Sequence, residues 1–543
     1  MDSELRDLWQ QFRRGQISRR EFVARALALG MTASSIGLLL HNAAPSLADG
    51  ARGPALSPRR GGTLRAADPG PTPGGLDPAT QQDTATIGIC HNIYNFLVRL
   101  TPHVPQIPYP DLATGWSTTP DGLTWTFPLH RGVKFHSGKS LTAADVIYSL
   151  NRIKVTGLGG APLLANITKM EARDPYTVVI HVKAPTPDLP VFLADYHMCI
   201  VENNVDPTMK GGYARFTTAP SGTGPFMLKD FVPGDHATIV RNPHYWEQPY
   251  PYLDAVKFVY LPQTTTQVAA VQSGQLDFVQ VLTPANAVPL LNAPRVKIVN
   301  LASTAFLNMR MRADRKPFSD PRVRNAFKYM VDRKAIDQAL VNGLSPLGND
   351  TPISPAFGRW YSNIGVRPRD IMKAQALLSA AGYTKDRPLH VNLYVGNTAG
   401  APEFASAFQQ MAGDVPNVAV TITEETLTTY YTHWLTVDFG ITSWGARAAP
   451  QVILDLLYRT NAIWNEGHYH NKRLEALLSA ASSELHVQKR KSLYRQIETL
   501  ISDDGPSIIP SYNVFTLPLR TRVQGFKPMP DTLHYYKDAW LAS

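Results

Sequence analysis

The stretch 438–450 holds the side chains whose types and spacing are best suited to contact a ligand. Trp444 is followed three residues later by Arg447, so a large aromatic ring and a guanidinium meet at the end of a predicted strand. Alternation along this strand places Phe439 and Ile441 on one side of it and Trp444 on the other. The same residues also fit an edge strand with a solvated arginine, because most arginine side chains lie at protein surfaces.

The sequence lacks the short motifs that mark common hydrolases and nucleotide-binding enzymes. It contains no Gly-x-Ser-x-Gly and no His-Glu-x-x-His. The segment 132–140 approaches a phosphate-binding loop, but five residues separate its glycines where four are needed. His468-x-His470 is too sparse a pattern for a metal site. We therefore expect no enzyme activity, no cofactor and no bound metal.

The composition is that of an ordinary globular protein with two or more domains: 543 residues, 44% hydrophobic and 18% charged. A net charge of +10 raises nucleic acid or a membrane surface as partners. The basic residues are scattered and form no stripe interleaved with aromatics, so we expect no nucleic-acid partner. Cys90 and Cys199 have no metal-ligand spacing, and one disulfide or two buried thiols both remain open.

The N-terminal segment has the features of an export signal. Charged residues precede an apolar run of 15 residues, 26–40, which is shorter than the about 20 residues of a membrane-spanning helix. Small residues follow at 46–48, where a signal peptidase cleaves. Arg19 and Arg20, followed by Phe22, are similar to a twin-arginine signal, which predicts the twin-arginine export machinery as a partner. We expect residues 1–48 to be the signal and residues 49–60 a disordered lead-in.

Strand patterns alternate with helical patterns along the rest of the chain, which predicts an α/β fold. An Asp121-Gly122 hairpin turn is expected, and Thr142 and Asp145 resemble a capping box at a helix start. Asp320-Pro321 begins another helix, and Gly274 closes the helix 264–273. Further helices are predicted at 86–100, 374–381 and 474–501, and further strands at 61–67, 174–182, 389–395, 418–423 and 508–519.

Several colinear motifs together resemble one protein family. They begin with Leu-Ala-x-x-Trp at 112–116, Asp-Gly-Leu-Thr-Trp-Thr-Phe at 121–127 and Leu-x-x-Gly-Val-Lys-Phe-His-x-Gly at 129–138. They continue at 141–146, 222–226, 242–246, 277–278 and 317–324. This series resembles the extracellular solute-binding proteins of family 5, the dipeptide and oligopeptide class, over essentially all of the chain beyond the signal.

The resemblance implies a periplasmic protein with two α/β lobes that enclose a small-molecule or short-peptide ligand in the cleft between them. It implies an inner-membrane ABC permease as partner, a monomer, and no chemistry of its own. Hinge crossings are expected near Asn300 and Pro510, with closure of the lobes as the functional motion. Lobe I would comprise 61–300 and 511–543, with an inserted subdomain at about 86–215, and lobe II would comprise 301–510. An exported hydrolase, or a chaperone or sensor with the same fold, are the alternatives.

One position departs from the peptide-binding pattern. Members that bind peptides usually carry Trp-x-x-Asp here, and the carboxylate pairs with the α-amino group of the peptide. This chain has Arg447 in that position, and a guanidinium repels an ammonium group but suits a carboxylate or phosphate. The resemblance therefore implies an anionic or zwitterionic solute, peptide-like or opine-like, although a peptide held by other acidic residues is the alternative.

The expected ligand-binding residues are Trp444, Gly445, Ala446, Arg447, Tyr512 and Asp77. Trp444 would stack on the ligand, unless it is a core residue, and Tyr512 would offer a polar contact near the second hinge crossing. Asp77 would border the cleft or cap a turn. The cluster 464–466 is a further aromatic and polar group of lobe II, for which a structural role is favoured.

Overall fold

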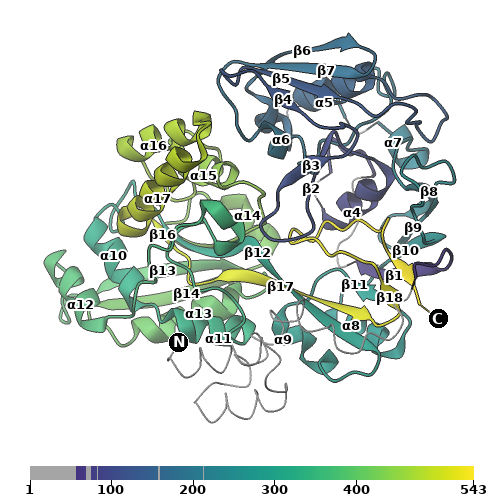
Figure 1. Ribbon diagram of the computed structural model, residues 1–543. Coiled ribbons are helices and arrows are strands. Elements are labelled where there is room, and N and C mark those ends of the chain that lie inside the picture. The colour runs from purple at the N-terminus through teal and green to yellow at the C-terminus, as the bar shows by residue number, and fades with distance from the viewer. Residues whose placement is uncertain (1–56, 69–74, 82, 157–158, 212, 543) are drawn as a thin grey trace, which may run out of the picture.

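The computed structural model describes residues 57–68, 75–81, 83–156, 159–211 and 213–542 (Figure 1). The predicted export signal, with Arg19, Arg20 and Phe22, lies outside the described residues. Of the predicted lead-in only 57–60 are described, and they form neither helix nor strand.

A mixed sheet of 11 strands runs through both lobes. It combines parallel pairs, such as β13 with β14, and antiparallel pairs, such as β12 with β17, which confirms the predicted α/β fold class. Its strands lie in the order β14 (Val418–Glu425), β13 (Leu389–Gly396), β15 (Phe439–Trp444), β12 (Val296–Met311), β17 (Tyr512–Arg520), β11 (Phe278–Val279), β1 (Thr63–Asp68), β10 (Ala255–Tyr260), β9 (His236–Arg241) and β8 (Phe226–Val232), and β16 (Ser507–Ile508) pairs with β12 off this path.

The two longest described strands, β12 and β17, connect the lobes (Figure 1). They pair antiparallel from Val296 opposite Arg520 to Ala302 opposite Val514. The register is interrupted before Phe306, which again faces β17, and from Phe306 onward β12 pairs with β15 of lobe II. One end of β12 therefore belongs to each lobe, with an irregular stretch between them.

Lobe I carries a second, smaller sheet at the top of Figure 1. Its strand order is β4 (Ser117–Thr118), β5 (Thr124–Pro128), β7 (Thr177–Val182) and β6 (Ile167–Asp174). The helix α5 (Ala143–Thr156) contacts β6 and β7 of this sheet. Its residues Val146, Leu150 and Ile153 are buried in the same core as Phe127 and Ile180 of the sheet.

The strand β15 separates two cores of lobe II. Phe439 and Ile441 are buried in a core with Phe327 and Phe408, whereas Trp444 belongs to a second core with residues such as Tyr494. The predicted alternation is therefore confirmed. β15 lies between β13 and β12, so the alternative of an edge strand is wrong.

The remaining elements are short strands and the helices that cover the sheets. The strands are β2 (Val98–Leu100), β3 (Pro108–Pro110), β18 (Val523–Gln524) and β19 (Trp540–Leu541). The 3₁₀ turns are η1 (Ala161–Leu164), η2 (Val288–Leu290) and η3 (Pro355–Trp360). The helices are α4 (Thr84–Ile93), α6 (Leu189–Phe192), α7 (Arg215–Thr218), α8 (Thr264–Ser273), α9 (Pro284–Ala287), α10 (Pro321–Met330), α11 (Arg333–Val341), α12 (Ile371–Ala380), α13 (Ala401–Ala412), α14 (Leu427–His433), α15 (Pro450–Tyr458), α16 (Lys472–Ser483) and α17 (Val487–Asp504).

Local signals located the element ends well where a turn or cap residue was present. Gly274 closes α8 in the left-handed conformation, with φ of 83°, and the Asp320 side chain accepts a hydrogen bond from the first turn of α10. The carboxylate of Asp145 accepts hydrogen bonds from both the backbone N–H and the hydroxyl of Thr142, at 2.8 Å each. Gly122 occupies the predicted turn between β4 and β5 with φ of 69°.

Four predicted elements are wrong in extent. The helix predicted at 86–100 ends at Ile93 and gives way to β2, and the strand predicted at 174–182 turns back at 174–177. The helix predicted at 474–501 is two helices, α16 and α17, and the strand predicted at 508–519 is interrupted between β16 and β17. Two of these breaks have a clear local cause: the Tyr176 N–H donates to Asp174 at 2.8 Å, and Pro510 lies between β16 and β17.

Both cysteines are buried, free thiols, which settles the alternative left open by their spacing. Burial raises the pKa of the Cys90 thiol well above its ordinary value, and the neighbouring Cys199 adds to this rise. Within the described part of the chain, no helix is long and apolar enough to cross a membrane.

The helix α17 buries one carboxyl group whose ionisation should govern lobe II stability. Glu498 is fully buried, and both of its carboxyl oxygens lie 3.1 Å from the donating N–H of Ser362. Burial raises the pKa of Glu498 to about 8, against the opposing effects of the Ser362 N–H and the Arg495 charge. Between its ordinary pKa and this raised value, Glu498 is therefore protonated in the folded protein and ionised in the unfolded chain.

We expect Glu498→Gln to remove part of the pH dependence of stability. The free energy of unfolding of the wild type should fall as pH rises from about 4.5 to 8 relative to that of the variant, because folding then requires proton uptake. Urea unfolding of both proteins at half-unit pH steps measures this difference, in which contributions of other groups cancel. A constant difference between the two proteins across this pH range would contradict the prediction.

Candidate ligand-binding site between the lobes

Two adjoining cavities lie where the lobes meet. The first chamber, of about 270 Å³, lies between the β2–β3 loop of lobe I and the η3 and α17 segments of lobe II. The second chamber, of about 230 Å³, reaches β17 and the segment 529–535. Gln106, Val191, Arg447 and Ala448 line both chambers, so the two adjoin at these residues.

Arg447 stands at the junction of the two chambers, on the loop that follows β15. Its backbone N–H donates to Thr304 Oγ1 at 2.8 Å, and that hydroxyl donates back to the Arg447 carbonyl at 2.8 Å. Thr304 lies in the irregular stretch of β12, so the hinge strand holds the loop in place. The guanidinium donates to the carbonyls of Ala446 and Gly445, at 2.9 and 3.4 Å, and forms no ion pair with any described residue.

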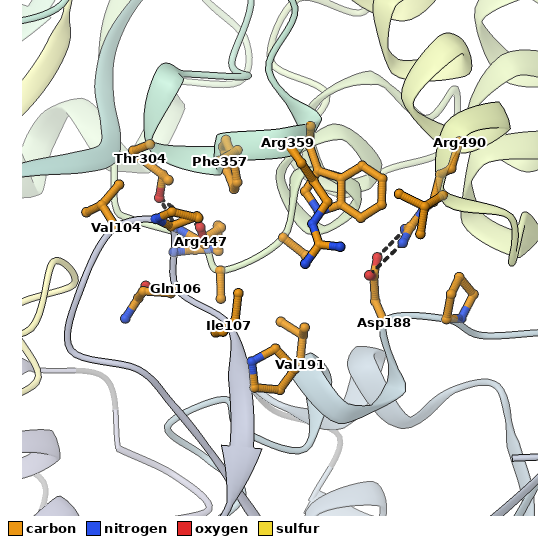
Figure 2. Close-up of a pocket in the computed structure, with 18 of the residues that line it drawn as sticks. Val104, Gln106, Ile107, Asp188, Val191, Thr304, Phe357, Arg359, Arg447 and Arg490 are labelled. Carbon is orange, nitrogen blue, oxygen red and sulfur yellow. Dashed lines mark hydrogen bonds and ion pairs between the residues drawn. The ribbon is translucent and has the colours of Figure 1, made fainter. Parts of the chain in front are cut away.

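A second guanidinium, that of Arg359 on η3, points toward the first chamber (Figure 2). It is exposed, lies 5.6 Å from the centre of its neighbouring Trp360 ring, and has no carboxylate partner in the described part of the chain. The lobe II side of this chamber therefore presents two arginines without counter-ions. Sequence reasoning missed Arg359, because no motif or periodic pattern distinguishes the segment 355–360.

The first chamber is bordered by contacts between the lobes. Asp188, at the start of α6, accepts a hydrogen bond at 2.7 Å and a second, shorter one from the guanidinium of Arg490 on α17 (Figure 2). Both side chains are less than 10% exposed. Gly358 approaches Pro105 of lobe I so closely that a Cβ would lie 2.7 Å from the proline ring, and its φ of 58° also favours glycine. These contacts require the lobes to be close together.

Carboxylates are concentrated in the second chamber. Asp195 accepts hydrogen bonds from the His197 ring at 2.6 Å and from the His197 backbone at 3.1 Å. Burial by itself raises its pKa, but the bonds to His197 and the charge of Arg447 outweigh that effect and lower it. Asp531 accepts a hydrogen bond from Gln106 at 3.0 Å, and its pKa is raised by burial despite this bond, with Asp195 adding to the rise.

The structure brings three of the predicted binding residues to the cavity and places the other three in the interior. Gly445, Ala446 and Arg447 line the second chamber. Trp444 is 5% exposed, and its indole N–H donates to Glu466 at 2.9 Å inside lobe II, which is the core alternative named from the sequence. Glu466, from the cluster 464–466, is thus structural.

Tyr512 and Asp77 do not line either chamber. The hydroxyl of Tyr512 lies 2.9 Å from Asn349 Oδ1 and 3.0 Å from the Thr351 carbonyl, in a core position that is 1% exposed. Asp77 is paired with the buried guanidinium of Arg152 at 2.8 and 2.5 Å. Both side chains are buried, which corrects the expectation that they face the cleft. For Asp77 the turn-capping alternative is confirmed, because its Oδ1 accepts a hydrogen bond from the Ala79 N–H at 3.1 Å.

The described residues contain no group of three or more His, Cys, Asp and Glu side chains that could hold a metal ion. His468, from the sparse His-x-His pattern, has its Nε2 atom 2.9 Å from the Leu435 carbonyl.

Residues 108–464 match the model of a protein family described as "Bacterial extracellular solute-binding proteins, family 5 Middle". The chain belongs to this family. Its members are binding proteins, and the cavity between two lobes is where such a protein holds a solute. This chain is accordingly a periplasmic solute-binding subunit of an ABC importer, as its motifs predicted.

Known relatives align with most of this chain. Heme-binding protein A of Haemophilus influenzae is 26% identical over 477 residues, which cover 81% of this chain and 85% of that protein. Glutathione-binding protein GsiB of Salmonella choleraesuis is 26% identical over 485 residues, covering 86% and 92%.

Two solved structures show the same two-lobed fold. The periplasmic binding protein DppA from Helicobacter pylori, in complex with the peptide STSA, is 24% identical with a TM-score of 0.76, over 89% of this chain and 99% of that one. The binding protein AgaA from A. tumefaciens, in complex with agropinic acid, is 24% identical with a TM-score of 0.74, over the same shares.

The Asp188–Arg490 pair connects the two lobes. Because proteins of this family enclose their solute between the lobes, the pair should contribute to the affinity for the solute. Asp188→Asn leaves the Arg490 charge buried without a counter-charge when the lobes are closed, at a cost of roughly 2–5 kcal/mol. We expect the variant to adopt a more open average shape in small-angle X-ray scattering and to bind its solute more weakly.

The double variant Asp188→Asn/Arg490→Gln is the matched control, because it removes both charges. It should recover part of the lost affinity, since no unpaired charge remains. If Asp188→Asn leaves both the scattering curve and the affinity unchanged, the pair does not stabilise closure.

Proposed function

We propose that the solute is a small peptide-like or opine-like acid, anionic or zwitterionic, and that Arg447 binds its acid group. The observation that carries the proposal is an arginine at the junction of two cavities with no ion pair among the described residues. A guanidinium offers paired N–H donors that match a carboxylate. Binding to its own loop carbonyls positions the side chain without forming an ion pair among the described residues, although its charge acts on the nearby Asp195.

Arg359 supports the same conclusion from the lobe II side of the first chamber. Asp188 and Arg490 neutralise each other there, so Arg359 and Arg447 exceed the one remaining carboxylate of the lining, Glu484, by one positive charge. The volumes, about 270 and 230 Å³, lie near the small end of the usual range for ligand cavities. A solute of a few residues' size suits them, whereas a long peptide does not.

The names of similar proteins support a solute of this kind without identifying it. The two relatives above are named for heme and glutathione, and the two solved structures contain a peptide and an acid, agropinic acid. Such variety within one family indicates that the cavity side chains, rather than the fold, select the solute.

We propose that lobe I comprises 61–300 and 511–543, with an inserted subdomain at about 86–215, and that lobe II comprises 301–510. The cores support this division for most of the tail, because Leu517 and Leu519 pack in the core that contains Phe127 and Phe278. Tyr512, next to the boundary, packs instead in the lobe II core around Trp444. We also propose that the protein acts as a monomer, performs no chemistry, and transfers its solute to the membrane permease when the lobes separate.

Replacement of Arg447 tests the proposed role directly. Arg447→Asp should lower affinity for an anionic solute by well over tenfold, on the order of 2–5 kcal/mol for a desolvated pair. Isothermal titration with the solute extracted from the native protein measures this loss. Arg173→Asp, the same change at an exposed arginine of β6, is the control and should bind as the wild type does. Unchanged affinity of Arg447→Asp would remove this residue from the site.

We propose export by the twin-arginine machinery on the basis of Arg19, Arg20 and Phe22. Arg19→Lys/Arg20→Lys should leave the precursor in the cytoplasm, because the export receptor reads the paired guanidinium groups. Cell fractionation followed by immunoblotting measures the distribution. Arg13→Lys/Arg14→Lys changes a second arginine pair of the same segment and should leave export intact. Equal periplasmic amounts of both variants would contradict this route.

A further inference from the structure

The second chamber combines two carboxylates with a buried histidine whose ring nitrogens make no hydrogen bond of normal geometry to the described residues. Asp195 and Asp531 both line it, as does His91. His91 is 3% exposed, and at hydrogen-bonding geometry neither of its ring nitrogens has a partner among the described residues. A buried polar group without a partner is costly, so such a group at a cavity wall indicates a ligand that would satisfy it.

His91 is held in place by packing rather than by polar contacts. Its ring stacks on that of Tyr535, with centroids 5.2 Å apart and an interplanar angle of 9°, and meets Phe96 edge-on at 5.0 Å. Burial lowers the pKa of His91 to about 3, helped by the charge of Arg99 and opposed by the Leu533 backbone. A neutral imidazole keeps one nitrogen as a hydrogen-bond acceptor, which suits an N–H donor of a ligand.

The two carboxylates retain capacity to accept hydrogen bonds. His197 binds only Oδ1 of Asp195, and Oδ2 has no partner among the described residues, while the side chain is 23% exposed. Each oxygen of Asp531 accepts one bond, from Leu533 N–H or from Gln106, both at 3.0 Å, although a carboxylate oxygen can accept two. His197 and Gln106 thus orient the two carboxylates. Neither carboxylate forms an ion pair with a described arginine or lysine, although the charge of Arg447 acts on Asp195 from across the chamber.

Aromatic side chains complete the chamber. Tyr196, Phe515 and Tyr535 line it alongside the acids. The Tyr535 ring is already covered by the Arg99 guanidinium, 4.4 Å from its centroid, and by the stacked His91 ring, so the carboxylates rather than this ring would attract a cation by accepting its N–H groups. Arg447, at the border to the first chamber, supplies the opposite charge.

From this arrangement we infer that the second chamber is a subsite for an ammonium or guanidinium group of the solute, bound by Asp195, Asp531 and His91. The inference rests on the proposed function, in which Arg447 binds the acid group, and narrows the solute class to zwitterions. The solute then carries a free amine or guanidine at one end and a carboxylate at the other. Peptide-binding members of the family carry a carboxylate at the position of Arg447. In this chain Asp195, which follows α6, and Asp531, in the segment 529–535, would take over its role.

The test uses a library of dipeptides with free N-termini and the same library N-acetylated, screened by thermal shift and followed by titration. The wild type should bind its preferred dipeptide about tenfold or more tighter than the acetylated form, because acetylation removes the ammonium charge. Asp531→Asn and Asp195→Asn should each bring the two affinities closer together, because each removes a negative charge that only the free ammonium group requires. Asp386→Asn, at an exposed position of lobe II, should keep the wild-type ratio.

The outcomes separate this inference from the proposed function. If the acetylated dipeptides bind as tightly as the free ones, or if both Asn variants keep the wild-type ratio, the cation subsite is wrong while the role of Arg447 stands. If no member of either library binds, the peptide-like solute class fails and the subsite falls with it. Mass spectrometry of small molecules extracted from periplasmic protein adds an independent result, since a bound solute without a basic nitrogen would overturn the subsite.

Discussion

The antiparallel pairing of β12 with β17 is the interaction on which the rest of the structure depends. Both strands contribute to one continuous sheet, so neither lobe can be assembled without the crossing. The register is interrupted between Ala302 and Phe306, where backbone pairing is absent and the chain can change direction. Thr304 lies in this interruption and binds the backbone of Arg447. Thr304 therefore links β12, which crosses between the lobes, to Arg447, the proposed ligand-binding residue.

The contacts across the cavity differ in kind from those within each lobe. Each lobe has its own apolar cores, whereas the lobes meet through a buried Asp188–Arg490 pair and close approaches such as that of Gly358 to Pro105. The attraction within a buried ion pair is largely offset by the cost of removing both charges from water. Closure that relies on such a pair is only weakly favoured by itself, so a solute that contacts both lobes can shift the balance.

The charges around the cavity are arranged largely by side, with Glu484 of lobe II as the exception. Lobe II contributes Arg359 and Arg447, while Asp195 and Asp531 come from segments whose hydrophobic residues pack in the lobe I core. In the described part of the chain, neither arginine forms an ion pair with a carboxylate. Neither of the two aspartates forms an ion pair with an arginine or lysine. A zwitterion oriented with its carboxylate toward lobe II and its cationic group toward lobe I would meet complementary charge at both ends. The same molecule reversed would meet repulsion twice, so charge would determine the orientation as well as the class of solute.

Local sequence patterns were sufficient to predict the α/β class, the family, the alternation in β15 and the position of Arg447 at its end. Each of these depends on residues that are neighbours in the chain.

The same patterns failed for Trp444, Tyr512 and Asp77. Their side chains fit a cleft or a core equally well until their partners are known, which are Glu466, Asn349 and Arg152. Asp195, Arg359 and Asp531 carry no local signal and come together only through folding. The sequence by itself therefore determined what kind of protein this is and placed one charge at its site. The tertiary structure decided which other charges face that one, because they are contributed by segments distant in the chain.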